Sequence, residues 1–149
     1  MVINGSRLLK LAPIKNMETS KKKFFDTSFG LSEAGYDIRI KQNIVFKKGQ
    51  KNSFTLASAI EEFQMPKNLV GEVKDKSSWA RKGLSVFNTV IEPGWNGFLT
   101  LELVYHGNKD LFIKTGQGIA QVIFYELAEE GDYGNGKYQN QEDKPVHSR

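Results

Sequence analysis

Short apolar or alternating segments, separated by polar turn residues, dominate the hydrophobic pattern of this chain. They recur at a spacing of roughly eight to twelve positions, which is typical of all-β proteins. Runs of this length predict short strands of a barrel or sandwich and not βαβ units. The predicted strands lie at residues 36–40, 44–46, 53–57, 69–73, 84–87, 98–105, 111–113 and 119–125.

Helical patterns are confined to two short stretches. Leucines at positions 8, 9 and 11 form an apolar stripe after capping candidates at Asn4 and Ser6. This pattern predicts a short helix within residues 2–12, which ends before a proline. A second helical stretch, of about a turn and a half, is predicted at residues 77–82.

Two polar segments lack any apolar periodicity. Residues 15–32 are predicted to form a loop, and residues 129–149 a mobile C-terminal tail. A tail that contains Lys137, Tyr138 and Gln141 close together has an alternative role, because it can order over a bound ligand. With no linker or repeat, residues 1–149 are interpreted as one domain.

Composition excludes several classes of protein. The 149 residues are 39% hydrophobic and 26% charged, as in ordinary globular chains. No apolar run approaches the roughly 18 residues needed to span a bilayer, and no signal-peptide pattern is present, so a cytoplasmic location is expected. Cysteine is absent, which excludes disulfides, thiol catalysis and the His/Cys/Cys zinc site of common nucleobase deaminases. The net charge of +4 comes without a nucleic-acid-binding motif, so we expect no nucleic-acid partner.

The segment 76–102 concentrates the candidate chemistry. Lys76 and Arg81 supply positive charge and Ser77 and Ser78 supply hydroxyls, a combination suited to phosphates. Taken singly, these residues are equally consistent with a surface pair and a helix cap. A turn at residues 92–95 then brings the carboxylate of Glu92 close to Trp95. The ring of Trp95 is either a stacking surface for a ligand or a core aromatic.

Glu102 interrupts the apolar strand predicted at 98–105. The period of two puts Leu99, Leu101, Leu103 and Tyr105 on one face of this strand and Glu102 on the other, beside Thr100. The ordinary fate of such a glutamate is solvation. In a partly desolvated cleft its pKa would instead be raised, which suits a group that takes up and delivers protons near neutrality.

Several motifs resemble those of the trimeric dUTPase and dCTP deaminase superfamily. Tyr36-Asp-Ile-Arg39 is similar to the first motif, and Lys76-Ser-Ser-Trp-Ala-Arg81 to the phosphate motif Arg-Ser-Ser-Leu-Ala-Arg. Ile91-Glu-Pro-Gly-Trp95 resembles the Ile-Asp-Pro-Gly-Trp turn, and Gly116–Gln121 a later glycine motif. Thr100-Leu-Glu-Leu103 resembles the deaminase strand that carries the catalytic glutamate, and Gly136–Gln141 the deaminase C-terminus. The resemblance is therefore closest to dCTP deaminase.

This resemblance implies a dUTPase-like distorted β-barrel (β-clip), mainly β, with a short N-terminal helix and one short central helix. It implies zinc-independent deamination of dCTP to dUTP and ammonia, with Glu102 as the catalytic group. It further implies Mg²⁺ bound with the nucleotide triphosphate, no protein metal site, and a homotrimer with sites between subunits. The substrate-binding residues would be Lys76, Ser77, Ser78, Arg81, Asn88, Glu92, Trp95, Thr100, Leu101, Gln121, Tyr133, Lys137 and Gln141.

Two alternatives remain open. Asn88-Thr-Val90 departs from the deaminase segment that separates single-activity from dual-activity enzymes. A dUTP diphosphatase, acting alone or after deamination, therefore stays a candidate, with Glu92 orienting water. A nucleotide-binding regulator without turnover is an alternative of another class, which Glu102 in register argues against. Asp37 is interpreted as a buried structural acid bonded to Arg39 or the backbone.

Overall fold

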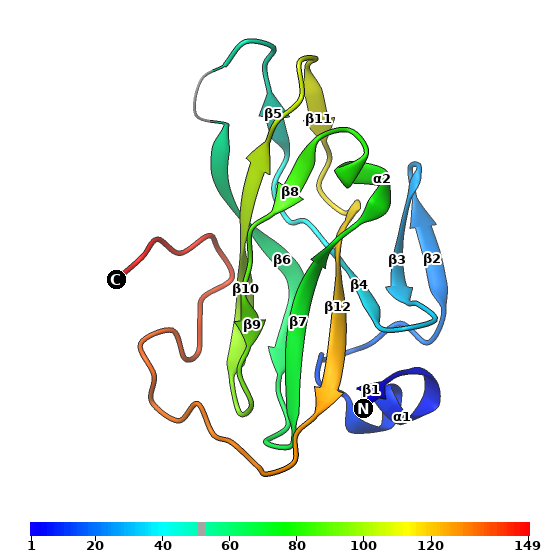
Figure 1. The fold of residues 1–149 in the computed structure, drawn as a ribbon, viewed down its shortest axis with the longest axis vertical. Coiled ribbons are helices and arrows are strands. Elements are labelled where there is room, and N and C mark those ends of the chain that lie inside the picture. Colours follow the sequence, from blue (N-terminus) through cyan, green and yellow to red (C-terminus); the bar gives the residue numbers. More distant parts are fainter. Residues whose placement is uncertain (51–52) are drawn as a thin grey trace.

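The computed structural model describes residues 1–50 and 53–149. Its strands pair antiparallel in three sheets, and the two short helices lie near opposite ends of β12 (Figure 1). The largest sheet has the order β2-β3-β4-β12-β7-β9, with β1 also paired to β12. Its strands are β1 (Val2–Ile3), β2 (Lys21–Phe24), β3 (Thr27–Leu31), β4 (Tyr36–Arg39), β7 (Leu69–Asp75), β9 (Val90–Ile91) and β12 (Gly118–Glu126).

The remaining elements complete the fold. The second sheet has the order β6-β10-β8, and β5 pairs with β11 in the third. These strands are β6 (Phe54–Gln64), β8 (Leu84–Val86), β10 (Asn96–Tyr105), β5 (Ile44–Phe46) and β11 (Leu111–Ile113), and the helices are α1 (Gly5–Leu11) and α2 (Ser77–Ala80). The predicted mainly β fold with two short helices is confirmed. Within the described residues the hydrogen bonds form separate sheets and no closed ladder.

One segment was predicted wrongly. Residues 15–32 contain the hairpin of β2 and β3, where a loop was expected. All four residues of β2 are exposed, so its sequence, Lys-Lys-Lys-Phe, shows no alternation that would indicate a strand. β6 also continues to Gln64, beyond the predicted end at residue 57. The second half of the strand was not recognised, since the buried Glu61 interrupts its apolar pattern.

The N-terminal helix forms as predicted, without the expected capping bond. Asn4 precedes α1, yet its side chain makes no bond to the helix. Its Nδ2 instead donates to the carbonyl of Glu33 at 2.8 Å. This bond ties the start of the helix to the loop before β4.

One apolar core joins the sheets and the first helix. Its fully buried members include Leu8 of α1, Ile38 of β4, Phe63 of β6, Leu103 of β10 and Phe124 of β12. Burying a side chain of this size contributes roughly 1.5–3 kcal/mol. The core therefore fixes β10 against β6, and with it the strand that carries Glu102.

A bulge on β6, opposite Leu99, interrupts the pairing of β10. The pairing of β10 with β6 shifts between Phe98 and Thr100. A bulge of this kind redirects the side chains around it. Leu99 was expected on the core face with Leu101 and Leu103, but it is only partly buried and faces the same cavity as Glu102.

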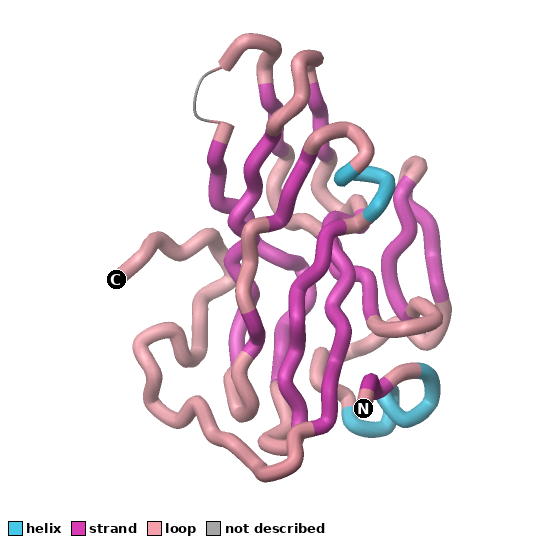
Figure 2. The backbone as a smooth tube through the Cα atoms, in the orientation of Figure 1, coloured by secondary structure: helices cyan, strands magenta, loops and turns pink. Residues whose placement is uncertain are grey.

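The C-terminal segment after β12 contains no helix or regular strand, and it returns along the side of β9 and β10 (Figures 1 and 2). Gln141 forms an isolated parallel bridge with Gly97. The indole N–H of Trp95 donates to the carbonyl of Tyr138 at 2.7 Å. The segment thus packs on β10 of its own chain. Its predicted mobility remains a prediction, as does the single-domain organisation. None of the described helices has the length and apolarity to cross a membrane.

Candidate functional site

A cavity of about 600 Å³ lies between β10, the segment 88–92 and the C-terminal tail. Its size is within the range of pockets that hold small molecules. Strands β6 and β10 provide one wall, and the tail provides the opposite wall. The lining residues are Phe54, Leu56, Asn88, Thr89, Val90, Ile91, Glu92, Trp95, Leu99, Thr100, Glu102, Tyr133, Tyr138, Gln141, Val146, His147 and Ser148.

Glu102 lies on the cavity wall, as predicted. It is half-buried, and the apolar side chains of Phe54, Leu56 and Leu99 line the same cavity. Removal from water disfavours the ionised carboxylate, so burial raises the pKa of Glu102. The arrangement provides a partly desolvated carboxyl group on the wall of a cavity, as a general acid–base requires.

Thr100, two residues before Glu102, connects the tail to the strand. Its buried Oγ1 accepts a hydrogen bond from Gln141 Nε2 at 2.7 Å and another from the Val146 N–H at 3.0 Å. Thr100 and Gln141 were both predicted to bind substrate, and the structure brings them into direct contact. One hydroxyl therefore holds the part of the tail that covers the cavity.

Asn88 contacts the same strand with its side chain. Its Nδ2 donates to the carbonyl of Thr100 at 2.7 Å, and its Oδ1 accepts from the N–H of Glu102 at 2.9 Å. The Phe87 N–H donates to the Glu102 carbonyl at 2.7 Å. The main chain of Glu102 is thus held on both of its polar groups.

Trp95 is a core aromatic that also reaches the cavity, and its predicted contact with a ligand remains a prediction. The ring is 5% exposed and packs against Phe63, with centroids 6.1 Å apart. It also lines the cavity, together with the exposed Glu92. The turn between them needs Gly94, because φ is 76° there and a Cβ would lie 2.6 Å from an Asp132 oxygen.

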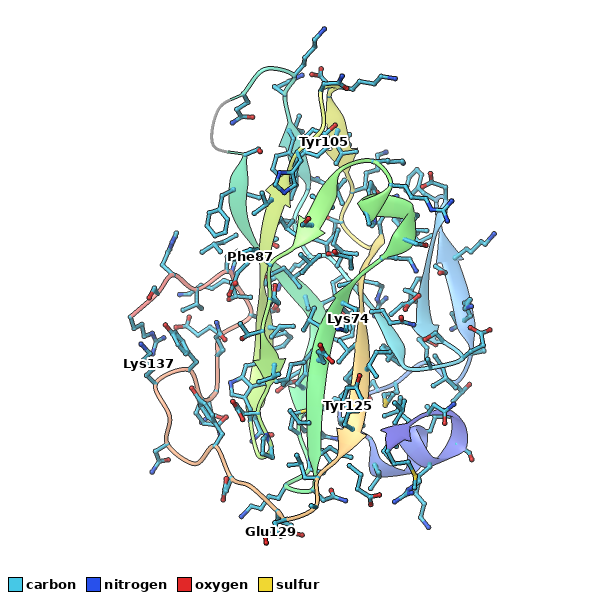
Figure 3. The ribbon with its side chains drawn as sticks, viewed as in Figure 1. Lys74, Phe87, Tyr105, Tyr125, Glu129 and Lys137 are labelled. Carbon is cyan, nitrogen blue, oxygen red and sulfur yellow. The ribbon has the colours of Figure 1, made fainter. Side chains whose placement is uncertain are left out.

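Tyr133 also lines the cavity, and its hydroxyl accepts the Tyr138 N–H at 3.1 Å. Lys137 does not line it. Its amine donates to the carbonyl of Arg149 at 2.9 Å, and Figure 3 shows it on the outer side of the tail, away from β10. Leu101 is fully buried in the core, so its side chain does not reach the cavity.

The residues predicted to bind phosphate lie elsewhere, on and around α2. Lys76, Ser77, Ser78, Arg81 and Gln121 do not line the cavity that contains Glu102. Within one chain the candidate site is therefore divided into two parts. The cavity holds the acid and the aromatic ring, and the region at α2 holds the two serines and Arg81, of which Ser77 and Arg81 are exposed.

Lys76 makes contacts that were not predicted. Its Nζ binds Asp37 Oδ2 at 2.6 Å and Ser28 Oγ at 2.9 Å, and both side chains of the ion pair are largely buried. Asp37 was correctly predicted as a buried acid, but Arg39 is not its partner. Arg39 instead contacts Glu61, with its Nε and its main-chain N–H each 2.9 Å from a carboxylate oxygen.

Two further side chains around α2 complete this region. Gln121 Nε2 donates to Ser32 Oγ at 2.8 Å. Ser78 Oγ is buried and has no hydrogen-bond partner among the described residues. A buried hydroxyl without a partner is rare, because leaving it unsatisfied costs about 1–3 kcal/mol.

Comparison with known proteins decides the family. A family model described as dCTP deaminase-like matches residues 40–127. This chain belongs to the dCTP deaminase-like family. It is 37% identical over 145 residues to the dCTP deaminase of Campylobacter concisus (strain 13826), a match that covers 77% of this chain and 78% of the relative. The dCTP deaminase of Chlamydia abortus is 34% identical over 157 residues, with 85% and 81% covered.

Solved structures support the same fold. The 2′-deoxycytidine 5′-triphosphate deaminase of Agrobacterium tumefaciens superposes with a TM-score of 0.61 at 13% identity, covering 88% of this chain and 50% of that one. The EIAV dUTPase gives a TM-score of 0.57 at 23% identity and covers 80% and 94%. The predicted dUTPase-like fold is thus confirmed.

Sequence reasoning missed several residues of this dCTP deaminase-like cavity. Leu99 was missed because a bulge cannot be read from alternation. The tail residues 146–148 were missed because no apolar pattern marks them. Phe54 and Leu56 were treated only as strand residues, although the alternation of β6 places both on one side of it. Thr89, Val90 and Tyr138 lie in segments that were expected near the ligand, and the missed lining residues are Phe54, Leu56, Ile91, Leu99, Val146, His147 and Ser148.

Glu61 was also overlooked. It is a buried carboxylate on β6, and desolvation raises its pKa while the contact with Arg39 opposes that shift. It does not line the cavity of Glu102. Its contacts with the side chain and N–H of Arg39 join β6 to β4, which indicates a structural role.

Proposed function

We propose that this protein deaminates dCTP by hydrolysis to dUTP and ammonia. The observation that carries the proposal is Glu102, a half-buried carboxyl with a raised pKa on the wall of a nucleoside-sized cavity. Membership of the dCTP deaminase-like family and the names of the relatives point to the same reaction. The dUTP produced is a precursor for thymidine nucleotides, by removal of diphosphate and methylation.

Glu102 would act as both base and acid. The ionised carboxylate takes a proton from water as the oxygen attacks C4 of cytosine, and the proton passes to ring N3. The tetrahedral carbon then holds both the new hydroxyl and the amine. Transfer of the hydroxyl proton through Glu102 to the amine breaks the C4–N bond and releases ammonia. The carboxylate is thereby regenerated.

The tail and the turn would position the nucleoside. Trp95 would pack against deoxyribose, and Glu92 would accept a hydrogen bond from its 3′-hydroxyl. Tyr133 and Gln141, which already face the cavity, would close over the nucleotide. Asn88 would contribute through its neighbouring main-chain groups. For Leu101, only the main chain is placed to contribute.

The triphosphate would be bound by a second chain in a homotrimer. Ser77, Ser78, Arg81 and Gln121 lie outside the cavity of their own chain, so a neighbouring subunit is the natural source of these groups. Lys76 would support this surface from behind, because Asp37 and Ser28 already bind its amine. Lys137 would need to turn inward from its contact with Arg149.

Magnesium would arrive with the triphosphate. Among the described residues no group of three His, Asp or Glu side chains is arranged to hold a metal ion. The phosphate oxygens themselves would be the main ligands, as is usual for Mg²⁺ bound with nucleotides. The ion would neutralise phosphate charge, and the deamination steps above involve only Glu102 and water.

A second activity, hydrolysis of dUTP to dUMP and diphosphate, is favoured by one observation. Glu92 is exposed on the cavity wall, where its carboxylate can contact water as well as the sugar. It would orient water toward the α-phosphate. Such an enzyme would carry out deamination and diphosphohydrolysis in sequence.

A product assay tests these proposals. The protein is incubated with dCTP or with dUTP in the presence of Mg²⁺, and ammonia, dUTP, dUMP and diphosphate are measured. Ammonia from dCTP is expected, and Glu102→Gln should lower its rate by at least about 100-fold, since a positioned acid–base contributes 10²–10⁴-fold. The variant should still bind dCTP.

Glu129→Gln is the matched control, because Glu129 is exposed on the tail and does not line the cavity. Its rate should equal that of the parent. Ammonia release at the parental rate by Glu102→Gln would overturn the assignment of Glu102. Release of diphosphate from dUTP without release of ammonia from dCTP would show that the protein is a dUTP diphosphatase. Binding of the nucleotides without either product would indicate a regulator.

A further inference from the structure

Strand β8 ends beside Glu102 in a way that regular pairing does not explain. Val86 pairs with Leu103 in the last registered pair of β8 and β10. Continuing this register would place Phe87 opposite Glu102, and Thr89 opposite Thr100. In an antiparallel ladder the Phe87 carbonyl would then accept from the Glu102 N–H, and the Thr89 N–H would donate to the Thr100 carbonyl.

The side chain of Asn88 makes both of these bonds instead. Its Oδ1 accepts from the Glu102 N–H at 2.9 Å, and its Nδ2 donates to the Thr100 carbonyl at 2.7 Å. A primary amide carries one acceptor and a donor in a fixed plane, as a peptide group does. The amide therefore replaces the carbonyl of residue 87 and the N–H of residue 89 in the ladder.

This replacement has a geometric consequence. The Phe87 N–H still donates to the Glu102 carbonyl, but the main chain of residues 88–89 no longer needs to remain paired with β10, and from Asn88 onward it lines the cavity. The polar groups of β10 meanwhile stay satisfied, which matters because an unpaired, part-buried peptide group is costly. The cavity can therefore open next to Glu102 while β10, which carries Glu102, remains fixed.

We propose that Asn88 is a positioning residue, whose side-chain amide fixes the main chain of Glu102 and so aims its carboxyl at the base. This proposal rests on the proposed function for its kinetic meaning. It differs from direct substrate binding, because the amide oxygen and one N–H are engaged by β10. A misplacement of about 1 Å in a reacting group can lower a rate by roughly 100-fold.

Kinetics distinguish positioning from binding. Asn88→Ala removes both bonds, and we expect kcat for dCTP to fall roughly 10- to 100-fold while KM changes by less than about threefold. Asn108→Ala is the matched control, since Asn108 is an exposed loop asparagine outside the cavity. An unchanged kcat, or a raised KM at constant kcat, would overturn the proposal.

Amide hydrogen exchange followed by NMR tests, independently of catalysis, whether the Asn88 side chain holds the main chain of Glu102. In Asn88→Ala the Glu102 amide should exchange at least about fivefold faster, because its acceptor is lost. In Asn88→Asp the carboxylate still accepts, so the Glu102 amide should exchange as in the parent. An unchanged Glu102 amide in the alanine variant would contradict the proposal.

The two experiments fail independently. If the parent protein releases no ammonia from dCTP, the proposed function is wrong, and the exchange of the Glu102 amide still decides whether Asn88 holds the strand. If Asn88→Ala does not fold, Asn88→Asp gives the decision. In Asn88→Asp the Glu102 amide should remain protected from exchange. Its kcat should be lower than that of the parent, since the carboxylate cannot donate to the Thr100 carbonyl. A parental kcat in this variant would overturn the proposal.

Discussion

At the scale of single residues, the environment of a charged group decides what it can do. Glu102 and Glu61 are both carboxylates on long strands, and desolvation raises the pKa of each. Glu61 is bound by Arg39 and does not face the cavity, whereas Glu102 lies on the cavity wall. A raised pKa therefore indicates a candidate acid–base only where a substrate can reach the group.

Lys76 shows the limit of reading a motif by charge alone. The motif correctly predicts a cation at the start of α2, but not where the amine points. Asp37 and Ser28 are 39 and 48 positions away in sequence, and only the folded sheet brings them to Lys76. The buried pair leaves Arg81 as the exposed cation of this motif.

The raised pKa of Glu102 gives a stability prediction with a definite sign. Because the folded pKa lies above the unfolded one, ionisation costs the native state stability. That cost is absent below the unfolded value of about 4.3, develops as the pH rises through the folded pKa, and is complete above it. Glu102→Gln should therefore melt roughly 1–2 °C higher than the parent at pH 8, a small effect because the group is only half-buried.

Thermal denaturation from pH 4 to pH 8 measures this difference, which should vanish at the acidic end. Glu129→Gln again provides the comparison at an exposed site. A variant that is less stable than the parent at pH 8 would show that the carboxylate makes favourable contacts instead of being desolvated.

At the scale of elements, a strand could be predicted where apolar and polar residues alternate clearly along it. The strands with an apolar rhythm, such as β7, β10 and β12, were placed within a few residues. The hairpin β2–β3 was missed because β2 is exposed on every residue, and β9 because two residues carry no period. The bulge of β6 opposite Leu99 was missed because the pairing of two strands, and not the local sequence, creates it.

The tail was identified as a candidate covering segment from Lys137, Tyr138 and Gln141, yet its actual attachment depends on a strand residue. Thr100 accepts from both Gln141 and Val146. Thr100→Val keeps the branched shape and removes the acceptor. Trypsin should then cleave after Lys137, an exposed residue of the tail, roughly five- to tenfold faster, because two hydrogen bonds no longer hold the tail.

Limited proteolysis followed by mass spectrometry measures the cleavage rate. Thr55→Val makes the same chemical change on β6, at a residue outside the cavity, and should leave the rate as in the parent. Equal rates for Thr100→Val and Thr55→Val would show that other contacts hold the tail.

At the scale of the whole molecule, the division of the predicted site between two surfaces is the main feature. The cavity contains the acid, the ring and the tail, and the α2 surface contains the hydroxyls and Arg81. The acid, the ring, the hydroxyls and Arg81 were all predicted from one short span of sequence, residues 76–102. The sequence motif could not show that the fold separates them, because proximity along the chain does not imply proximity in space.

Mixing two inactive variants tests whether neighbouring chains complete each site. Glu102→Gln and Arg81→Ala should each be inactive alone. After unfolding and refolding together, random assembly should restore about a quarter of the parental ammonia release, because one in four sites combines both intact groups. The same variants refolded separately and then mixed are the control.

Recovered activity in the co-refolded sample alone would support shared sites. No recovery, with trimers present by light scattering, would contradict the proposed division of the site between chains. Full activity of Arg81→Ala by itself would remove Arg81 from the phosphate surface.

The exposed lysines of β2 have a consequence for how copies of this protein meet. An outermost strand leaves unpaired peptide groups that strands from other molecules can join, which is how sheets grow into aggregates. Lys21, Lys22 and Lys23 cover this open margin with charged side chains, and Lys21 pairs with Glu33 and Lys22 with Glu18, so an incoming strand would have to remove these charges from water. Such a margin opposes the addition of another strand, and the same charged residues are the reason why no hydrophobic pattern revealed β2.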